Sequence, residues 1–335
     1  MEESKMAVTA AMVKELREMT GAGMMDCKNA LAETDGDIQA AIEIIRKKGQ
    51  AVAAKREDRQ AAEGCVLSAI KEGFAAIVAL KCETDFVAKN ESFRALTKQI
   101  LDAAVAAGAK TLDEVKALKL DDRTVEEHIT DEIGKTGEKM ELGAYECISA
   151  PSVAAYDHLG NKLATIVGFN LEGVSAEVGK EVAMQVAAMN PVAVNREAVP
   201  AAVIEEEKNV AIEKTKTEQV RKAVEAALKK AGFNPNHFDS DDHIASNITK
   251  GWITEEDAAK AREIMAEAAE KKAANLPQQM IDNIVNGRIN KYYKENVLLE
   301  QEYHRDATLT VGQYLDKEMK GLVAVEFKRV NLNQD

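Results

Sequence analysis

Two histidines in one polar segment are the first residues of this sequence that could bind a metal ion. His237 and His243 flank Asp239, Asp241 and Asp242, and imidazole nitrogens and carboxylate oxygens are common ligands of divalent metals. The same segment is also rich in Asn, Pro, Ser and Asp, a composition typical of polar turns. The composition favours a turn, and a metal enzyme built on the two histidines stays open as an alternative.

Other patterns for catalysis or nucleotide binding are absent or incomplete. Gly134-Lys135-Thr136 resembles the end of a phosphate-binding loop, but the glycine required five positions earlier is replaced by Ile129. The sequence contains no Gly-x-Ser-x-Gly, His-Glu-x-x-His or Gly-x-Gly-x-x-Gly. We therefore expect no catalytic residue, no metal and no cofactor.

The segment Thr84-Asp85-Phe86-Val87 points to a different kind of chemistry, the binding of another protein. It follows an apolar stretch that ends at Cys82 and precedes Asn90, a candidate N-cap of a helix. Phe86 follows an acidic residue in this turn. Either Phe86 packs at the entry of the helix as a hydrophobic staple, or it is exposed and inserts into a partner.

The first 55 residues predict a bundle of three short helices. Residues 24–33 predict the middle helix, and residues 56–63 are charged and predict a linker. Apolar residues at helical spacing mark the first and third helices: Met12, Val13, Leu16, Met19, Ile38, Ala41, Ile42 and Ile45.

Residues 64–139 predict a first α+β subdomain. Apolar runs on either side of Lys71-Glu72-Gly73 indicate a β-hairpin, and a helix is expected after Asn90. Thr124 and Glu127 form a capping box, which predicts a further helix from Val125.

Residues 140–199 predict a second subdomain of the same design. Strands are expected over 141–150 and 163–167, and a helix that begins before Val178 is expected to end at Asn190-Pro191. The two copies together predict a duplicated α+β core.

Residues 200–293 predict a protruding antiparallel helical hairpin. A helix of about 30 residues is expected from Pro200, and its thin apolar stripe calls for partner helices over 254–275 and 277–293. Residues 294–335 are then expected to supply a C-terminal helix and a strand that return to the core.

The composition excludes several classes of protein. The 335-residue chain carries a formal charge of −13, which disfavours direct binding of nucleic acid. It contains no long uncharged apolar run for a membrane span, and its N-terminus lacks the apolar region of a signal peptide. The four cysteines are scattered without Cys-x-x-Cys spacing, as in a reducing compartment. We expect a cytoplasmic protein that does not contact membranes.

Two long segments resemble the translation elongation factor Ts family. They are residues 13–31, from Val13 through Thr20-Gly21-Ala22-Gly23 to Leu31, and residues 84–90, Thr-Asp-Phe-Val-Ala-Lys-Asn. Weaker similarities follow in the family's order at 183–188, 286–288 and 310–313, so the resemblance covers most of the chain.

This resemblance implies a fold and an activity. The fold would be a three-helix domain similar to ubiquitin-associated domains, two similar α+β subdomains and a helical hairpin. The activity would be guanine nucleotide exchange on elongation factor Tu in its GDP-bound and nucleotide-free forms. Thr84, Asp85, Phe86 and Val87 match the segment that, in the family, helps to dislodge the magnesium ion of this partner.

The resemblance also implies further contacts with elongation factor Tu. We expect them from the bundle and from the core, at Val13, Lys14, Arg17, Lys28, His158 and Gln185. The sequence departs from the family pattern at Gln185, where members often carry His, and in a hairpin that is enlarged over 217–276. A protein-interaction scaffold without exchange activity is the main alternative.

Overall fold

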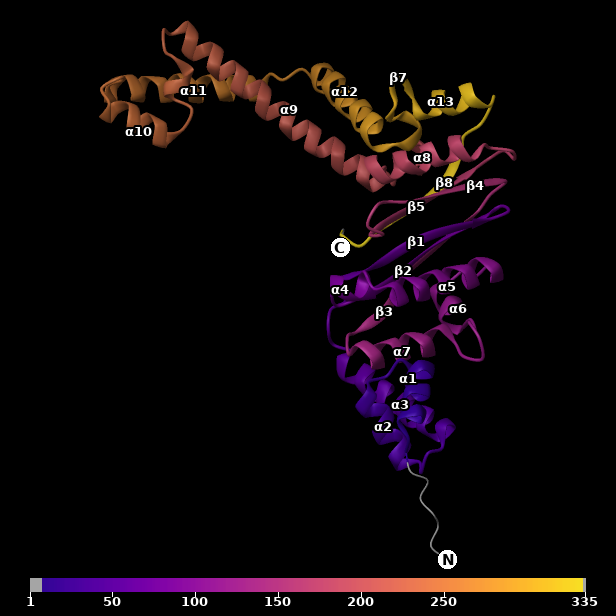
Figure 1. Ribbon diagram of the computed structural model, residues 1–335. Coiled ribbons are helices and arrows are strands. Elements are labelled where there is room, and N and C mark those ends of the chain that lie inside the picture. The colour runs from indigo at the N-terminus through magenta and orange to yellow at the C-terminus, as the bar shows by residue number, and fades with distance from the viewer. Residues whose placement is uncertain (1–7, 334–335) are drawn as a thin grey trace, which may run out of the picture. The chain divides into compact units, whose positions relative to one another are not determined.

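The computed structural model describes residues 8–333 and has an α+β fold, as the sequence predicts (Figure 1). The described chain forms two compact units. One contains the residues up to Val194 together with those from Glu302 onward, and the other is Asn195–Gln301. Within residues 8–333, no helix combines the length and the apolar character needed to cross a lipid bilayer.

The N-terminal helices α1 (Ala10–Thr20), α2 (Met24–Glu33) and α3 (Ile38–Arg56) form the expected bundle. Gly21 ends α1 in the left-handed conformation at φ +68°, and the side chain of Asp37 caps α3. Leu16, Cys27 and Leu31 are fully buried in the bundle core.

The bundle packs on the core through a close helix crossing. A Cβ atom at Gly134 of α7 (Val125–Thr136) would lie 2.9 Å from the Cα of Gly49 in α3, so this approach needs glycine at position 134. The side chain of Lys135 passes over Gly21, at 2.9 Å from where a Cβ of Gly21 would be. These contacts place the bundle on α7.

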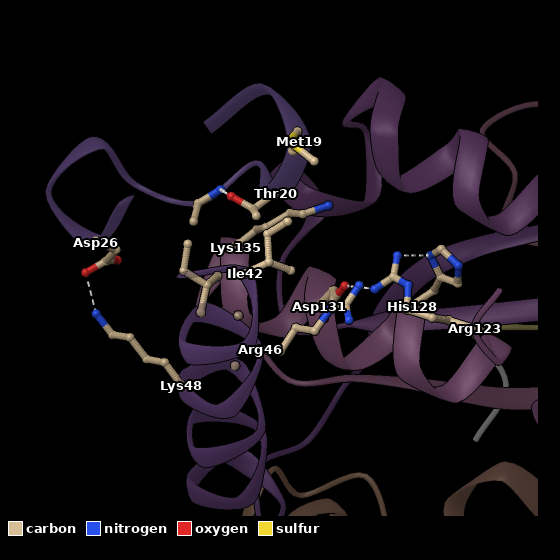
Figure 2. A pocket seen from close by; sticks show the side chains of 14 residues that line it. Met19, Thr20, Asp26, Ile42, Arg46, Lys48, Arg123, His128, Asp131 and Lys135 are labelled. Atoms are coloured by element: carbon tan, nitrogen blue, oxygen red, sulfur yellow. Dashed lines mark hydrogen bonds and ion pairs between the residues drawn. The ribbon is translucent and has the colours of Figure 1, made fainter. Parts of the chain in front are cut away.

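A pocket of about 180 Å³ remains between the bundle and α7 (Figure 2). Arg123 contacts both Asp131 and His128 on its α7 side, and Lys48 pairs with Asp26 on its bundle side. The charged groups of this pocket are therefore largely engaged with one another.

The first subdomain contains a three-stranded antiparallel sheet in the order β1 (Glu63–Lys71), β2 (Phe74–Cys82), β3 (Met140–Ser149). The predicted hairpin turn at Glu72-Gly73 is confirmed, with Gly73 at φ +66°. Four helices accompany the sheet: α4 (Asp85–Ala88), α5 (Glu91–Ala107), α6 (Leu112–Ala117) and α7.

The second sheet has the order β4 (Ser152–Asp157), β5 (Leu163–Phe169), β8 (Ala324–Asn331), with α8 (Ala176–Met189) against it. The expected boundary at residue 140 was wrong, because Met140–Ser149 pairs with β2 and belongs to the first sheet. The apolar pattern of this segment predicts a strand, but a strand can pair with either sheet.

The two sheets face each other with their helices outside, so the layers run helix, sheet, sheet, helix (Figure 1). Apolar side chains from both sheets form one cluster between them, listed as Val66, Ala75, Ile77, Ala79, Ile148, Ala164 and Ile166. The short strands β6 (Glu302–Tyr303) and β7 (Asp306–Thr310), which the sequence did not predict, lead into α13 (Val311–Glu318).

The second unit is built on the long helix α9 (Ala201–Lys230), which contacts α11 (Glu255–Ala274) and α12 (Gln278–Asn296). Short 3₁₀ turns lie at Arg196–Ala198, Pro235–His237 and Leu298–Glu300. The helices therefore occur where the sequence predicts the hairpin.

The end of this hairpin is more ordered than the predicted polar turn. An additional helix, α10 (Asp241–Thr249), helps to bury Phe238, Leu228 and Ile253 in a small core. His243 contacts Asp239, but no group of three or more potential ligands that could hold a metal ion occurs between residues 8 and 333. Within this part of the chain, His237 and His243 therefore do not belong to such a group.

Candidate functional site

Phe86 lies on the one-turn helix α4 and exposes 83% of its surface. The Thr84 side chain caps this helix by accepting a hydrogen bond from the amide of Val87, at 3.4 Å. Val87 packs against the core and Ala88 is buried, so the turn directs Phe86 away from the core. The staple interpretation is therefore wrong for Phe86, and the ring is available at the surface.

Glu138 anchors this turn from a distant part of the chain. Its carboxylate accepts two hydrogen bonds from Thr84, one from the backbone amide at 3.1 Å and one from the hydroxyl at 2.7 Å. Glu138 lies between α7 and β3. Sequence reasoning missed this residue, because no local pattern links positions that are 54 residues apart.

Asp85, which precedes Phe86, forms an ion pair with Lys89 at 2.6 Å. The hydrogen bond from the Lys89 ammonium lowers the pKa of the Asp85 carboxyl below its ordinary value. The turn therefore presents an ionised carboxylate, an acceptor of hydrogen bonds, beside the exposed ring.

His158 lies on the tight turn between β4 and β5. The amide of Asn161 donates to the carbonyl of His158 at 3.0 Å, and Gly160 has φ +91°, as a type II turn requires. The hydroxyl of Tyr156 contacts Nδ1 of His158 at 3.0 Å. Leu159, at the outer corner, exposes 93% of its surface.

The structure brings the Asp85 turn and the His158 turn to one pocket of about 470 Å³. Asp85 and Lys89 line it from α4 and the residue that follows, and His158 and Leu159 line it from the β4–β5 turn. The spacing of these residues in sequence does not predict this pocket, because α4 and the β4–β5 turn lie far apart in the chain.

Gln185 does not face a partner, contrary to the expectation. Its side chain is 0% exposed. The side-chain amide donates to the carbonyl of Glu302 at 3.1 Å, and the side-chain oxygen accepts from the amide of His304 at 3.0 Å. Gln185 therefore ties α8 to the segment β6–β7 and cannot contact another protein directly.

Neighbouring Glu181 on α8 binds the same segment through charge. It pairs with Arg305 at 2.6 Å and with His304 at 3.0 Å. The hydrogen bond from Arg305 lowers the pKa of the Glu181 carboxyl below its ordinary value. Since Glu181 and Gln185 are both buried, we assign them a structural role.

The bundle offers cations and methionines at its surface. Lys14, Arg17 and Lys28 are exposed, as predicted, but Val13 is only 9% exposed and packs in the bundle core. Val13 is thus a core residue, because it lies on the inner stripe of α1. Met19, predicted on that stripe, is instead 56% exposed near the end of α1.

The first turn of α2 also exposes Met24 and Met25, by 61% and 63%. Exposed methionines on either side of a glycine-rich loop form an adaptable apolar surface. Met24 and Met25 lie in the helix predicted over residues 24–33, but the sequence pattern did not indicate their exposure.

Comparison with known proteins agrees with the resemblance found in the sequence. A family model described as Elongation factor TS matches two segments, residues 83–254 and 223–334. The first begins immediately before Thr84.

Curated relatives match along almost the whole chain. Proteins named Elongation factor Ts from Parabacteroides distasonis and Bacteroides fragilis are 58% and 57% identical, and one from Porphyromonas gingivalis is 48% identical. Each alignment covers 98% of this chain and 100% of the relative.

Proposed function

Because the chain belongs to the elongation factor Ts family, we propose that it promotes guanine nucleotide exchange on elongation factor Tu and that Phe86 inserts into this partner. The chain would bind the GDP-bound form, dislodge its magnesium ion and release GDP, and then leave the nucleotide-free form open to GTP. The observation that carries this proposal is the 83% exposure of Phe86 in the segment that matches the family.

The physical basis is a coupling between two binding equilibria. A protein that stabilises the nucleotide-free partner must weaken the binding of nucleotide by the same factor. Nucleotide affinity depends on Mg²⁺ and on backbone amides around the phosphates, so displacing their supporting elements is effective. The proposed exchange needs no covalent step by this chain, no cofactor and no direct contact with nucleic acid.

Burial of one phenylalanine ring contributes only part of this coupling. Transfer of such a side chain from water stabilises a complex by about 2–3 kcal/mol, or roughly 30- to 150-fold in an equilibrium constant. Larger effects require additional contacts. Asp85 and His158 lie at the adjoining pocket and are proposed to accept or donate hydrogen bonds at the partner's surface.

The contacts that hold the Phe86 turn in place favour insertion of the ring into the partner. Glu138 and the cap of Thr84 hold the turn in place before any partner binds. A preorganised side chain loses less conformational entropy on binding than a mobile one.

We further propose that the bundle is a second contact for the same partner. Lys14, Arg17 and Lys28 are exposed on it, and the bundle belongs to the same compact unit as Phe86. Two linked contacts raise the effective concentration of each for the partner. Since elongation factors work in translation, this role includes a cytoplasmic location.

Replacing Phe86 with alanine tests the proposal. Elongation factor Tu loaded with a fluorescent GDP analogue is mixed with wild type or Phe86→Ala, and release is followed by stopped flow. We expect the saturating release rate to fall by at least tenfold. Ile70→Ala is the matched control, because Ile70 is 55% exposed at the opposite end of the first sheet.

Two results would count against the proposal. An unchanged release rate for a folded Phe86→Ala variant, with circular dichroism equal to wild type, would reject insertion of the ring. If wild type binds elongation factor Tu without accelerating release, the interaction-scaffold alternative is correct.

A further inference from the structure

We infer that Leu159 and Arg94 form a second anchor for the partner, and that they receive a segment with an apolar side chain next to a carboxylate. The inference rests on the proposed function and assigns a binding role to two residues outside the Phe86 turn. It follows from the exposure of Leu159, the open guanidinium of Arg94 and their shared pocket.

Leu159 is an apolar side chain held out to solvent on a rigid support. It is 93% exposed, at the corner of the His158–Asn161 turn. This turn is fixed to the first sheet, because the carbonyl of Asn161 accepts a hydrogen bond from the amide of Val66 at 2.7 Å. The next residue, Lys162, pairs with Glu63 of β1 at 2.8 Å.

The rigid turn lowers the entropic cost of burying Leu159 in a complex. A flexible loop would lose that freedom on binding, and an apolar residue on it would gain little. A leucine so exposed also makes no contribution to the chain's own core, so its burial is available to a partner.

Arg94 supplies a positive charge on the other side of the same pocket. It lies in the first turns of α5, and its Nε donates to the carbonyl of Ala88 at 3.3 Å, which orients the guanidinium. Among residues 8–333 it forms no ion pair. Its remaining N–H groups match the planar geometry of a carboxylate.

The other charges of the pocket are already matched. Asp85 pairs with Lys89, and Glu63 pairs with Lys162. Arg94 therefore gives the residues that line the pocket a surplus of one positive charge, although the chain as a whole carries a charge of −13. This local surplus favours an acidic group on the partner.

The pocket is continuous with the surface around Phe86, so the protein that binds in it is the partner that receives Phe86. Asp85 lies at the pocket, and Phe86 is the next residue on the same helical turn. A protein that surrounds Phe86 must cover the adjoining surface. The pocket, of about 470 Å³, has room for several side chains of an amphipathic segment.

An anchor and a displacing residue affect exchange differently. Contacts that are equally strong before and after nucleotide release raise affinity without changing the release rate at saturation. We therefore expect Leu159 and Arg94 to set the concentration at which exchange is half-maximal, whereas Phe86 sets the maximal rate.

The test uses full-length variants and elongation factor Tu loaded with a fluorescent GDP analogue, over a range of exchange-factor concentrations. Leu159→Ala should raise the half-saturating concentration about tenfold, or about 1.4 kcal/mol, and keep the maximal rate within twofold. Leu159→Met should retain wild-type behaviour, and Ile70→Ala is the control for loss of an exposed apolar residue.

Arg94→Gln should raise the half-saturating concentration about fivefold and should weaken its dependence on salt, because a charge pair across the interface is lost. Arg94→Glu should have a larger effect. A salt dependence equal to wild type in Arg94→Gln would overturn the assigned carboxylate.

Either of two results would overturn the role of Leu159: a half-saturating concentration equal to wild type, or a lower maximal rate at an unchanged half-saturating concentration. Calorimetric titration with nucleotide-free elongation factor Tu separates this inference from the proposed function. If wild type binds but releases no GDP, exchange is disproved, and the affinity of Leu159→Ala still decides the anchor.

Discussion

Glu138 supports the Phe86 turn from outside α4. The substitution Glu138→Ala should therefore loosen the turn without removing the Phe86 side chain. The carboxylate accepts both hydrogen bonds from Thr84, at 3.1 Å and 2.7 Å. Without this carboxylate, the amide and hydroxyl of Thr84 form hydrogen bonds with water instead. Helix α4 is then held only by the Thr84 side-chain cap and by the packing of Ala88.

The magnitude follows from these two bonds. A hydrogen bond to a charged group contributes about 1.5–3 kcal/mol when well shielded, and Thr84 and Glu138 are only partly buried. We take about 2 kcal/mol for the pair. If binding requires the ordered turn, that loss weakens the complex by at most roughly 30-fold, at 1.4 kcal/mol per factor of ten.

Calorimetric titration with nucleotide-free elongation factor Tu measures the change in affinity, and stopped-flow GDP release shows whether the maximal rate survives. Glu138→Gln should fall between Glu138→Ala and wild type, because the amide keeps one acceptor oxygen. Glu72→Ala, in the exposed hairpin turn, is the control. Equal affinities for Glu138→Ala and wild type would refute the claim that this carboxylate preorganises the turn.

Two further predictions concern the supports of the core. Gly134→Val should force α3 away from α7, because its Cβ would clash with Gly49. Calorimetry should then show several-fold weaker binding to elongation factor Tu. Gly287→Ala is the control and should leave this affinity unchanged, because the space around Gly287 is open. Glu181→Gln should lower the unfolding free energy by about 1–2 kcal/mol at pH 7. Because Arg305 lowers the folded-state pKa of Glu181, this difference in urea denaturation should shrink as the pH falls below the ordinary glutamate value of about 4.3. A difference that stays constant down to pH 3 would contradict the assigned ion pair.

Elements with local signals could be predicted from the sequence. The capping box of Thr124 and Glu127 is present at the start of α7, and Asn90 caps α5 through the amide of Ser92. Pro200 precedes a helix of 30 residues, as the charged sequence after it indicates. Asn90 and Thr124 bond to backbone groups within three residues of themselves, and the ring of Pro200 fixes its own φ, so the information lies in a short window.

Features that depend on distant partners could not be predicted in this way. The pattern of residues 140–149 indicates a strand, but its pairing with β2 is decided by the packing of both sheets. Gln185 looked like a surface residue of a helix, and only the arrival of Glu302 and His304 explains its burial. Glu138 has no pattern of its own, because its role exists only once Thr84 lies beside it.

Phe86 shows why the candidate site was only half predictable. A phenylalanine before a helix is compatible both with a staple and with an exposed ring, since both place it in a turn. The structure decides between them through its neighbours: Val87 and Ala88 occupy the inward positions of α4, so the ring has no space in the core. The same reasoning applies to Leu159, whose turn is fixed by Asn161 and Lys162 rather than by its own side chain. In both places backbone and polar contacts hold the turn, and the apolar side chain is left free for a partner. A surface built in this way binds through side chains that its own fold does not need, so truncating them should weaken binding and leave folding intact.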